Sequence, residues 1–533
     1  FSVGSNWVGG AAPGAGNAAA FGLTSSTTPF TVSFTADAGT AGLTVSNQRP
    51  TFSLGGFTYN VSGDTLIGGA NGPVLTVTGG TLNTCVGFGQ MFLSQNAAQS
   101  GTLAVNGGTA TVQGTLTTMG GGRGDVAISN GGHLTVSGDV SAWGTGTRQN
   151  WSLAGVGSLL TANGTFRVGN EGSAFTMQVS GGGMADLDYL PLVGGNSAGQ
   201  ASITVSGTGS SLDCRYVQSE QGATTLTVID GGAVSMSDQL RLGCCYVAGS
   251  STVLVRGAES RLRVGNELLV GFETGGTHTL TIDQGAALIG DGEGQNLYAW
   301  IGHRGRGVLR VDGAGSEIRL KNRLHVGWPD ANSNGTLTVS NGASATLGSL
   351  WMNAGQGGTE TATVEGGAFV STAEWVDVGE ASTLTVRGGS GIEAAGGFGI
   401  RGWQSRAAEV VVGADSYIFA TSRIDLGHNA PVVGASILTL DGGTAYTLDY
   451  MPVNDTGIVS CLNATSGETI WQKRLRGRFS ASPMLAGDKL LLISEEGMGE
   501  SLGRLAAARG LRARATSASA IRRAWSVASA FIG

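Results

Sequence analysis

The sequence has little charge, little proline and no long apolar run, and each shortage excludes a class of protein. Only 13% of the residues are charged and the net charge is −7, so nothing in the electrostatics favours nucleic acid as a partner. No apolar run reaches the roughly 18 residues of a membrane-spanning helix, so we expect no transmembrane segment. The 9 prolines leave most backbone N–H groups free for the hydrogen bonds of a sheet.

The cysteines are few, and their number and spacing predict neither a disulfide framework nor a metal site. They stand at Cys85, Cys214, Cys244, Cys245 and Cys461. An odd number leaves at least one thiol unpaired, and no Cys-X-X-Cys or Cys/His spacing is typical of zinc. Aligning the repeats described below sets Cys214 opposite Gln239, too far from Cys244 to form a bridge. We expect Cys244 and Cys245 as buried or corner thiols, with a strained vicinal disulfide as the alternative. No metal or cofactor is predicted.

Glycine, in contrast, is abundant, with 94 residues, and it follows a short apolar-alternating run that returns along most of the chain. The run is typified by Thr225-Leu226-Thr227-Val228, with a glycine pair three residues later. Its copies begin at Val74, Thr102, Asp125, Trp151, Thr176, Ser202, Thr225, Thr252, Thr279, Val308, Thr336, Thr361, Thr383, Glu409 and Ile437. A period in the twenties indicates a solenoid whose corners contain the glycines.

The alternation within each run predicts how the solenoid is built. Leu226 and Val228 lie on one face of an extended strand, and Thr225 and Thr227 lie on the other. A second apolar run ends in glycine in each copy, as in Leu240 to Gly243. A turn of about 26 residues accommodates three short strands and three corners. The sequence therefore predicts an all-β fold, a right-handed parallel β-helix with about 15 turns at roughly 4.8 Å each.

The N-terminal region resembles a known class of exported proteins. Residues 5–21 contain an Asn-Trp pair, a glycine pair, Pro-Gly and a later Phe, as at the start of secreted bacterial proteins with autotransporter-associated β-strand repeats. Residues 73–449, the predicted β-helix, resemble the repeats of those passenger-like proteins. We expect residues 1–72 to form the cap and the first rungs, with Trp7 and Phe21 covering the open core.

The composition changes at the C-terminal end. Residues 450–500 resemble one blade of a PQQ-like β-propeller. The shared features are Gly457, Leu462, Ala464, Ser466, Gly467, Glu468, Trp471, Ser482, Pro483 and the strand from Lys489 to Ser494. One blade does not close a propeller of 4–8 blades, so the resemblance implies no cofactor here. Residues 501–533 form a basic Ala/Arg-rich tail, a possible terminal helix. We favour an out-of-frame remnant over a lipid-binding amphipathic helix.

Right-handed β-helices include polysaccharide lyases and hydrolases, so acidic residues are candidate catalytic groups. Asp186 and Asp188 would share one strand face, roughly 7 Å apart, and paired carboxylates are what glycoside hydrolysis requires. Asp291 and Glu293 lie in the longest corner loop of the repeats. A basic cluster follows at His303, Arg304, Arg306 and Arg310. All of these suit solvated corners and outward positions equally well, so we assign no catalytic or metal-binding residue.

Tryptophans recur in or just after the second run, at Trp143, Trp300, Trp328, Trp351, Trp375 and Trp403. Facing outward, Trp300, Trp328 and Trp351 would form a stripe that stacks on sugar rings; facing inward, they would belong to the core. Their positions within the run differ, so the sequence favours core or edge cover and keeps glycan contact as the alternative.

Together these features predict an exported β-helical protein with a structural or adhesive role, outside the cell or at its surface in association with the outer membrane. Polysaccharide, cell-envelope or matrix components and other copies of the chain are the expected partners. The alternative is a carbohydrate-active β-helix enzyme, a polysaccharide lyase or hydrolase, or a glycan-binding module.

Overall fold

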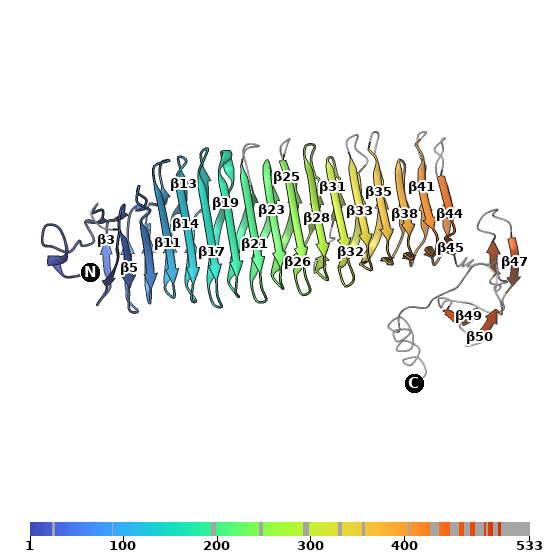
Figure 1. Cartoon of the computed structure of the whole chain (residues 1–533), viewed down its shortest axis with the longest axis horizontal. Coiled ribbons are helices and arrows are strands. Elements are labelled where there is room, and N and C mark those ends of the chain that lie inside the picture. The colour runs from blue at the N-terminus through green and yellow to red at the C-terminus, as the bar shows by residue number, and fades with distance from the viewer. Residues whose placement is uncertain are drawn as a thin grey trace. The chain divides into compact units, whose positions relative to one another are not determined.

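The computed structural model describes residues 1–447, apart from 24–26, 88, 193–198, 245–248, 291–297, 329–332, 354–357, 403–405 and 427–435, and five strands within 458–502. The chain divides into two compact units, Phe1–Thr447 and Leu448–Gly533. In the first unit, rungs of short strands stack one on another along a single axis (Figure 1). No helix among the described residues has the length and apolarity needed to span a membrane.

Each rung of the first unit contributes to three parallel sheets. The first sheet contains β2 (Pro29–Ser33), β5 (Arg49–Ser53), β8 (Val74–Thr78), β11 (Ser100–Asn106), β14 (Arg123–Ser129), β17 (Arg148–Ala154), β19 (Ala174–Ser180), β21 (Gln200–Ser206), β23 (Gly222–Ile229), β25 (Gly249–Arg256), β28 (Thr277–Asp283), β31 (Arg306–Asp312), β33 (Asn334–Ser340), β35 (Glu360–Glu365), β38 (Ser382–Arg387), β41 (Ala408–Gly413) and β44 (Ser436–Asp441). The second contains β3 (Ala38–Thr40), β6 (Thr58–Val61), β9 (Thr81–Thr84), β12 (Thr109–Val112), β15 (His133–Val136), β26 (Arg261–Val264), β29 (Ala287–Gly290), β36 (Phe369–Thr372), β39 (Gly391–Ala394), β42 (Tyr417–Ala420) and β45 (Thr444–Thr447).

The third sheet contains β1 (Ala18–Phe21), β4 (Gly42–Val45), β7 (Thr65–Ile67), β10 (Gln90–Ser94), β13 (Thr115–Met119), β16 (Val140–Trp143), β27 (Glu267–Val270), β30 (Tyr298–Ile301), β37 (Val376–Val378), β40 (Phe398–Ile400) and β43 (Ile424–Leu426). Six long strands bend from the second sheet into the third, namely β18 (Leu159–Arg167), β20 (Met184–Leu192), β22 (Ser211–Ser219), β24 (Ala233–Leu242), β32 (Glu317–Val326) and β34 (Ser344–Met352). Two short 3₁₀ helices, η1 (Gly4–Asn6) and η2 (Asn170–Gly172), complete the unit.

The predicted parallel β-helix is confirmed by the register of the first sheet. Leu226 pairs with Val253, which pairs with Leu280 in the following rung. All three side chains are buried in one continuous core, whereas Thr225 and Thr227 point outward. In-register stacking thus converts the period-two alternation of the sequence into an apolar interior and a threonine-rich surface.

Aromatic rings pack together at the N-terminal end of this core. The Trp7 indole packs edge-on against Phe21, with ring centroids 5.4 Å apart. Phe1 stacks on Phe34 at 4.9 Å and also contacts Tyr59. This cluster covers apolar surface that the first rung would otherwise expose.

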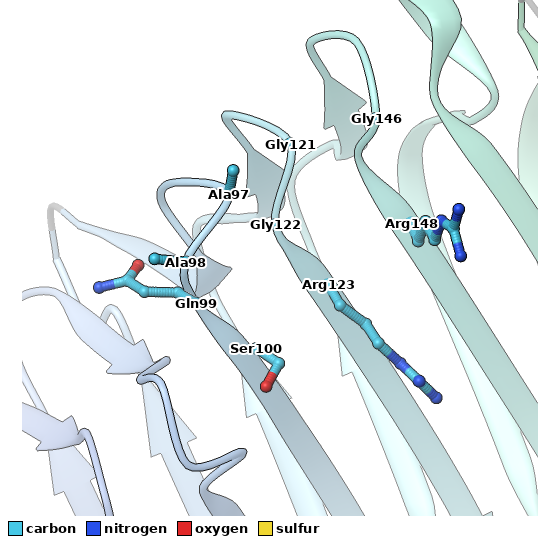
Figure 2. Close-up of a pocket in the computed structure, with 9 residues that line it drawn as sticks. All are labelled: Ala97, Ala98, Gln99, Ser100, Gly121, Gly122, Arg123, Gly146 and Arg148. Atoms are coloured by element: carbon cyan, nitrogen blue, oxygen red, sulfur yellow. The ribbon is translucent and has the colours of Figure 1, made fainter.

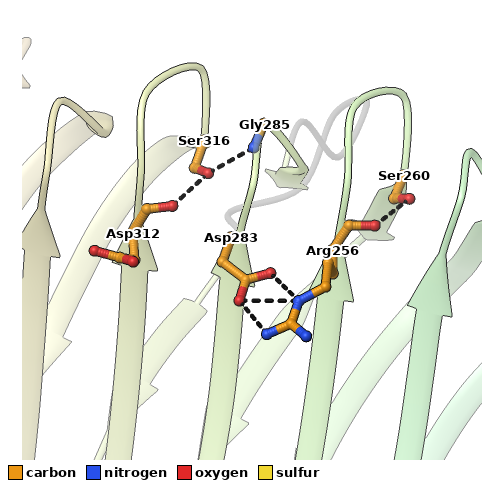
Figure 3. A network of polar contacts seen from close by, with 6 residues as sticks. All are labelled: Arg256, Ser260, Asp283, Gly285, Asp312 and Ser316. Carbon is orange, nitrogen blue, oxygen red and sulfur yellow. Dashed lines mark hydrogen bonds and ion pairs between the residues drawn. The ribbon is translucent and has the colours of Figure 1, made fainter.

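Serines bind consecutive rungs together at the glycine-rich corners (Figure 3). The Ser316 hydroxyl donates to the Asp312 carbonyl at 2.6 Å and accepts from the Gly285 N–H of the preceding rung at 2.9 Å. Ser260 bonds in the same way to the Arg256 carbonyl. Gly285 has a φ of 86°, a left-handed conformation that favours glycine. The corners are therefore ordered turns.

Two cysteine predictions are wrong. Cys214 pairs with Met236, and Gln239 pairs instead with Tyr216, because a β-bulge shifts the register between these positions. Cys244 is disulfide-bonded and is not the free thiol that we expected. Cys85 and Cys214 are free and buried.

The second unit contains antiparallel strands only, among its described residues. Strand β46 (Ile458–Leu462) pairs with β47 (Thr469–Arg474). Strand β49 (Lys489–Ile493) pairs with both β48 (Met484–Ala486) and β50 (Gly499–Leu502) in a separate sheet. Of the basic tail, residues 501–533, Ser501 and Leu502 lie in β50, and residues 503–533 lie outside the described residues, so the terminal helix stays a prediction.

Candidate functional site

A column of rings runs along the outer face of the third sheet. Trp300 on β30 pairs in register with His325 on β32, which pairs with Trp351 on β34. The Trp300 and His325 centroids are 5.6 Å apart with planes at 16°, and His325 meets Trp351 edge-on at 5.8 Å. Because the strands are parallel and in register, equivalent side chains recur at the rung spacing of roughly 4.8 Å.

A second column lies beside the first, at the corner that follows these strands. It consists of Phe272, His303 and Trp328, each directly after a glycine in the left-handed conformation. Phe272 stacks on His303 at 4.9 Å, and His303 stacks on Trp328 at 5.3 Å with planes at 22°. The left-handed glycine turns the chain so that the next side chain lies over its counterpart in the neighbouring rung.

Contacts between the two columns make one continuous surface. Trp300 meets Trp328 edge-on at 5.9 Å, and His325 meets Trp328 at 5.8 Å. Tyr298, 52% exposed, stacks on Trp300 at 5.3 Å and extends the surface sideways. We call this set the aromatic platform; its members are Phe272, Tyr298, Trp300, His303, His325, Trp328 and Trp351.

The His325 ring of the platform is neutral, and arginines lie at the platform's edges. Burial, with smaller effects from Arg323 and His303, lowers the pKa of His325 to about 4, so this ring is neutral at physiological pH. The Arg323 guanidinium lies over the Trp351 ring, 3.5 Å from its centroid, in a cation–π contact. At the other edge Arg241 forms an ion pair of 2.7 Å with Glu267.

The three predicted tryptophans therefore come together in one place, and all three face outward while partly buried. Of the other four members, the sequence singled out only His303, and it did so as part of a basic cluster, not as a neighbour of the tryptophans. His325 and His303 belong to the platform because the register between rungs brings them beside the tryptophans. A column-by-column alignment of the repeats would have placed His325 between Trp300 and Trp351. Trp143, 40% exposed on β16, lies outside the platform, and Trp403 lies outside the described residues.

Of the predicted acidic pairs, only Asp186 and Asp188 lie among the described residues. Asp186 and Asp188 both point outward from β20, and in register Asp186 lies beside Asp213 of the next rung. Burial, with a smaller effect from Asp186, raises the pKa of Asp213. Asp291 and Glu293 lie outside the described residues. In the described part of the chain, no group of three or more His, Cys, Asp or Glu is arranged to bind a metal.

A hollow of about 400 Å³ lies at the corners between β10 and β17 (Figure 2). Its walls are the corner backbone, small side chains such as Ala97 and Ala98, and two arginines. One of these, Arg123, is already paired with Asp125 at 2.9 Å. Compared with the platform, the hollow offers few groups with which to recognise a ligand.

The comparisons with known proteins find one distant structural match. No family model matches the sequence, and no curated protein matches it. Among solved structures, the chain is similar to a TibC-catalysed, hyper-glycosylated fragment of TibA, with 15% identity, 80% of this chain and 99% of that chain covered, and a TM-score of 0.19. A TM-score this low carries no argument about fold or function. The resemblance of residues 450–500 to a propeller blade finds no support.

Proposed function

We propose that this protein is a non-catalytic β-helical rod, exported to the cell surface, that binds polysaccharide through the aromatic platform. The observation that supports this function best is the pair of adjacent ring columns, which run along the rod axis on its outer surface. A linear polymer lying along that axis would meet one ring after another.

The chemistry of the platform suits sugars. Pyranose rings have apolar C–H faces that pack on indole and imidazole rings, and the neighbouring arginines supply donors for hydroxyl groups. Each column crosses three successive rungs, so the rings would contact several units of a long polymer. The neutral His325 ring favours a polymer of low charge. An adhesive role then follows from a long, low-charge rod with a polymer-binding surface on one of its faces.

Affinity electrophoresis tests this proposal. The full chain is run in native gels that contain hydroxyethyl cellulose, xylan or galactan, and retardation reports binding. We expect at least one of these polymers to retard the protein, and Trp328→Ala to weaken the retardation at least tenfold. Trp143→Ala removes an exposed tryptophan of the same sheet outside the platform, so it is the matched control and should bind normally.

Two outcomes would overturn the proposal. In the first, none of the polymers retards the protein, or Trp328→Ala binds as the unaltered chain does. In the second, the protein releases reducing ends or unsaturated products from these polymers, which would make it an enzyme.

A further inference from the structure

A fully buried carboxylate is connected to the main chain of Trp328. Glu360, the first residue of β35, has no exposed surface. One of its oxygens accepts from the Ser333 hydroxyl and the other from the Gly335 N–H. Ser333 in turn accepts from the Trp328 N–H at 2.9 Å. Ser333 therefore bridges Glu360 and the Trp328 backbone.

The same carboxylate also shapes the corner that precedes Trp328. Gly327 has a φ of 85°, and a Cβ built there would lie 2.3 Å from the Glu360 Cδ atom. The Glu360 side chain thus occupies the space that any other residue at 327 would need. The Gly327–Trp328 corner is packed directly on this carboxylate.

At the other two corners of the platform, Gly271 and Gly302 pack against backbone atoms of the neighbouring rung. At Gly271 and Gly302 the nearest atoms to a built Cβ belong to the backbone around Gly307 and Gly335, at 2.5 Å. Phe272 and His303 therefore follow corners that no ionisable side chain supports in this way. A comparable arrangement occurs outside the platform, where the buried His278 packs against Gly243.

We propose that Glu360 is a positioning residue for the aromatic platform: through Ser333 and the Gly327 corner it sets the place of the Trp328 ring, and gain or loss of its proton changes that place. The effect of Glu360 on polysaccharide binding rests on the proposed function, whereas its effect on the position of the Trp328 ring does not.

The groups around the Glu360 carboxylate determine the pH range in which it gains or loses its proton. Burial raises the pKa of Glu360 to about 7, while the hydrogen bonds from Ser333 and Gly335 and the charge of Arg406 act in the opposite direction. Arg406 also lowers the pKa of Glu380, which burial raises. An ionised carboxylate accepts at both oxygens, whereas a protonated one has a donor at one of them. The contacts of the Trp328 corner should therefore change near neutral pH.

The ¹⁹F NMR spectrum of the full chain labelled with 5-fluorotryptophan tests the inference without any ligand. Trp328→Phe identifies the Trp328 resonance. We expect Glu360→Ala to shift or broaden this resonance, because the Gly335 N–H and the Ser333 hydroxyl lose their acceptor. Glu360→Gln should keep it near its original position, since an amide accepts from Gly335 and donates to Ser333, and should abolish its shift between about pH 6 and 8.

His278→Ala is the matched control, because it removes a buried side chain from the equivalent space under Gly243 and should leave the Trp328 resonance unchanged. The inference is overturned if Glu360→Ala leaves the resonance in place, or if His278→Ala moves it as much. Should Glu360→Ala not fold, Glu360→Gln decides the question: a resonance that still titrates in this variant rules out Glu360 as the responsible group.

A double-mutant cycle on hydroxyethyl cellulose gels connects the inference to binding. Glu360→Ala should weaken retardation about tenfold in the unaltered chain and have no further effect when Trp328 is already alanine. Additive effects would place Glu360 outside the Trp328 pathway and would contradict the proposal. If the unaltered chain is not retarded by any polymer, the proposed function fails, and the ¹⁹F result still decides the role of Glu360.

Discussion

The indole of Trp300 lies nearly parallel to the imidazole of His325 in the next rung, with ring centroids 5.6 Å apart and planes at 16°. The two residues are paired directly in the register of the third sheet. Since burial keeps His325 neutral above a pKa of about 4, the contact is a stack of two uncharged rings at physiological pH. The histidine thereby continues an aromatic column between two tryptophans.

Trp300→Ala should have a larger effect on binding than on folding. Trp300 contacts Tyr298, His303, His325 and Trp328, so its removal shortens the first column and takes away its edge-on contacts with the second. Central aromatic residues at binding surfaces commonly contribute 2 kcal/mol or more, so we expect at least a tenfold weaker retardation in polysaccharide gels. Thermal unfolding should change little in comparison, and Trp143→Ala is again the control. A variant with unaltered retardation would show that the platform is not the binding surface.

The contact between Arg323 and Trp351 should be measurable as a coupling energy. The guanidinium lies 3.5 Å from the ring centroid, where a cation–π contact contributes about 0.5–1 kcal/mol. A double-mutant cycle of Arg323→Ala and Trp351→Ala, followed by urea unfolding, should give a coupling of this size. Arg319→Ala on the same strand, whose side chain pairs with Glu317 at 3.1 Å, is the control and should show no coupling to Trp351.

The sequence was sufficient for the fold because one pattern determines it. Alternating residues such as Leu226 and Thr227 assign the two faces of a strand, and recurrence at a nearly constant period requires the strands to stack. In-register pairing then follows, as between Leu226 and Val253. Even the aromatic cover of the N-terminal end was predictable, because Trp7 and Phe21 precede the first regular repeat.

The site was only partly predictable, because it depends on register between rungs of unequal length. Trp300, Trp328 and Trp351 were identifiable as tryptophans near the ends of runs, and aligned runs place His325 between Trp300 and Trp351. The contacts of Trp328 with Trp300 and His325 depend on the conformation of the corners, which residue spacing does not give. For the same reason residue spacing associates Asp186 with Asp188 of its own strand, although in the sheet Asp186 lies beside Asp213 of the next rung. A bulge, as between Cys214 and Tyr216, shifts the register without any marker in the residue spacing.

Alanine substitutions at core and surface positions of one strand should differ sharply in their effect on the free energy of unfolding. Leu280 is fully buried, and Leu280→Ala should lower the free energy of unfolding by about 2–5 kcal/mol through lost burial and an internal cavity. The adjacent Thr279 points outward, so Thr279→Ala should stay within about 0.5 kcal/mol of the unaltered chain. Urea midpoints measure both. Similar losses in the two variants would contradict the assignment of faces.

Acid should destabilise the rod through His278. This side chain is 2% exposed, its Nδ1 atom lies 3.1 Å from the Ser251 hydroxyl, and burial lowers its pKa to about 4. Between pH 6.5, the ordinary value, and about 4, the unfolded chain binds a proton that the native chain does not, so stability falls as the pH falls through this range. A shift of this size corresponds to a contribution on the order of 3 kcal/mol.

Glu360 contributes with the opposite sign, which makes the two groups separable. Its native pKa of about 7 exceeds the ordinary 4.5, so the native chain binds the extra proton and this contribution weakens stability as the pH rises from 4.5 to about 7. Urea unfolding from pH 4 to about 8 should therefore show a smaller acid loss in His278→Gln and a smaller loss towards neutral pH in Glu360→Gln. Part of the loss of stability in acid should remain in His278→Gln, because the pKa of His325 is also lowered to about 4. An acid loss in His278→Gln equal to that of the unaltered chain would exclude His278 as its source.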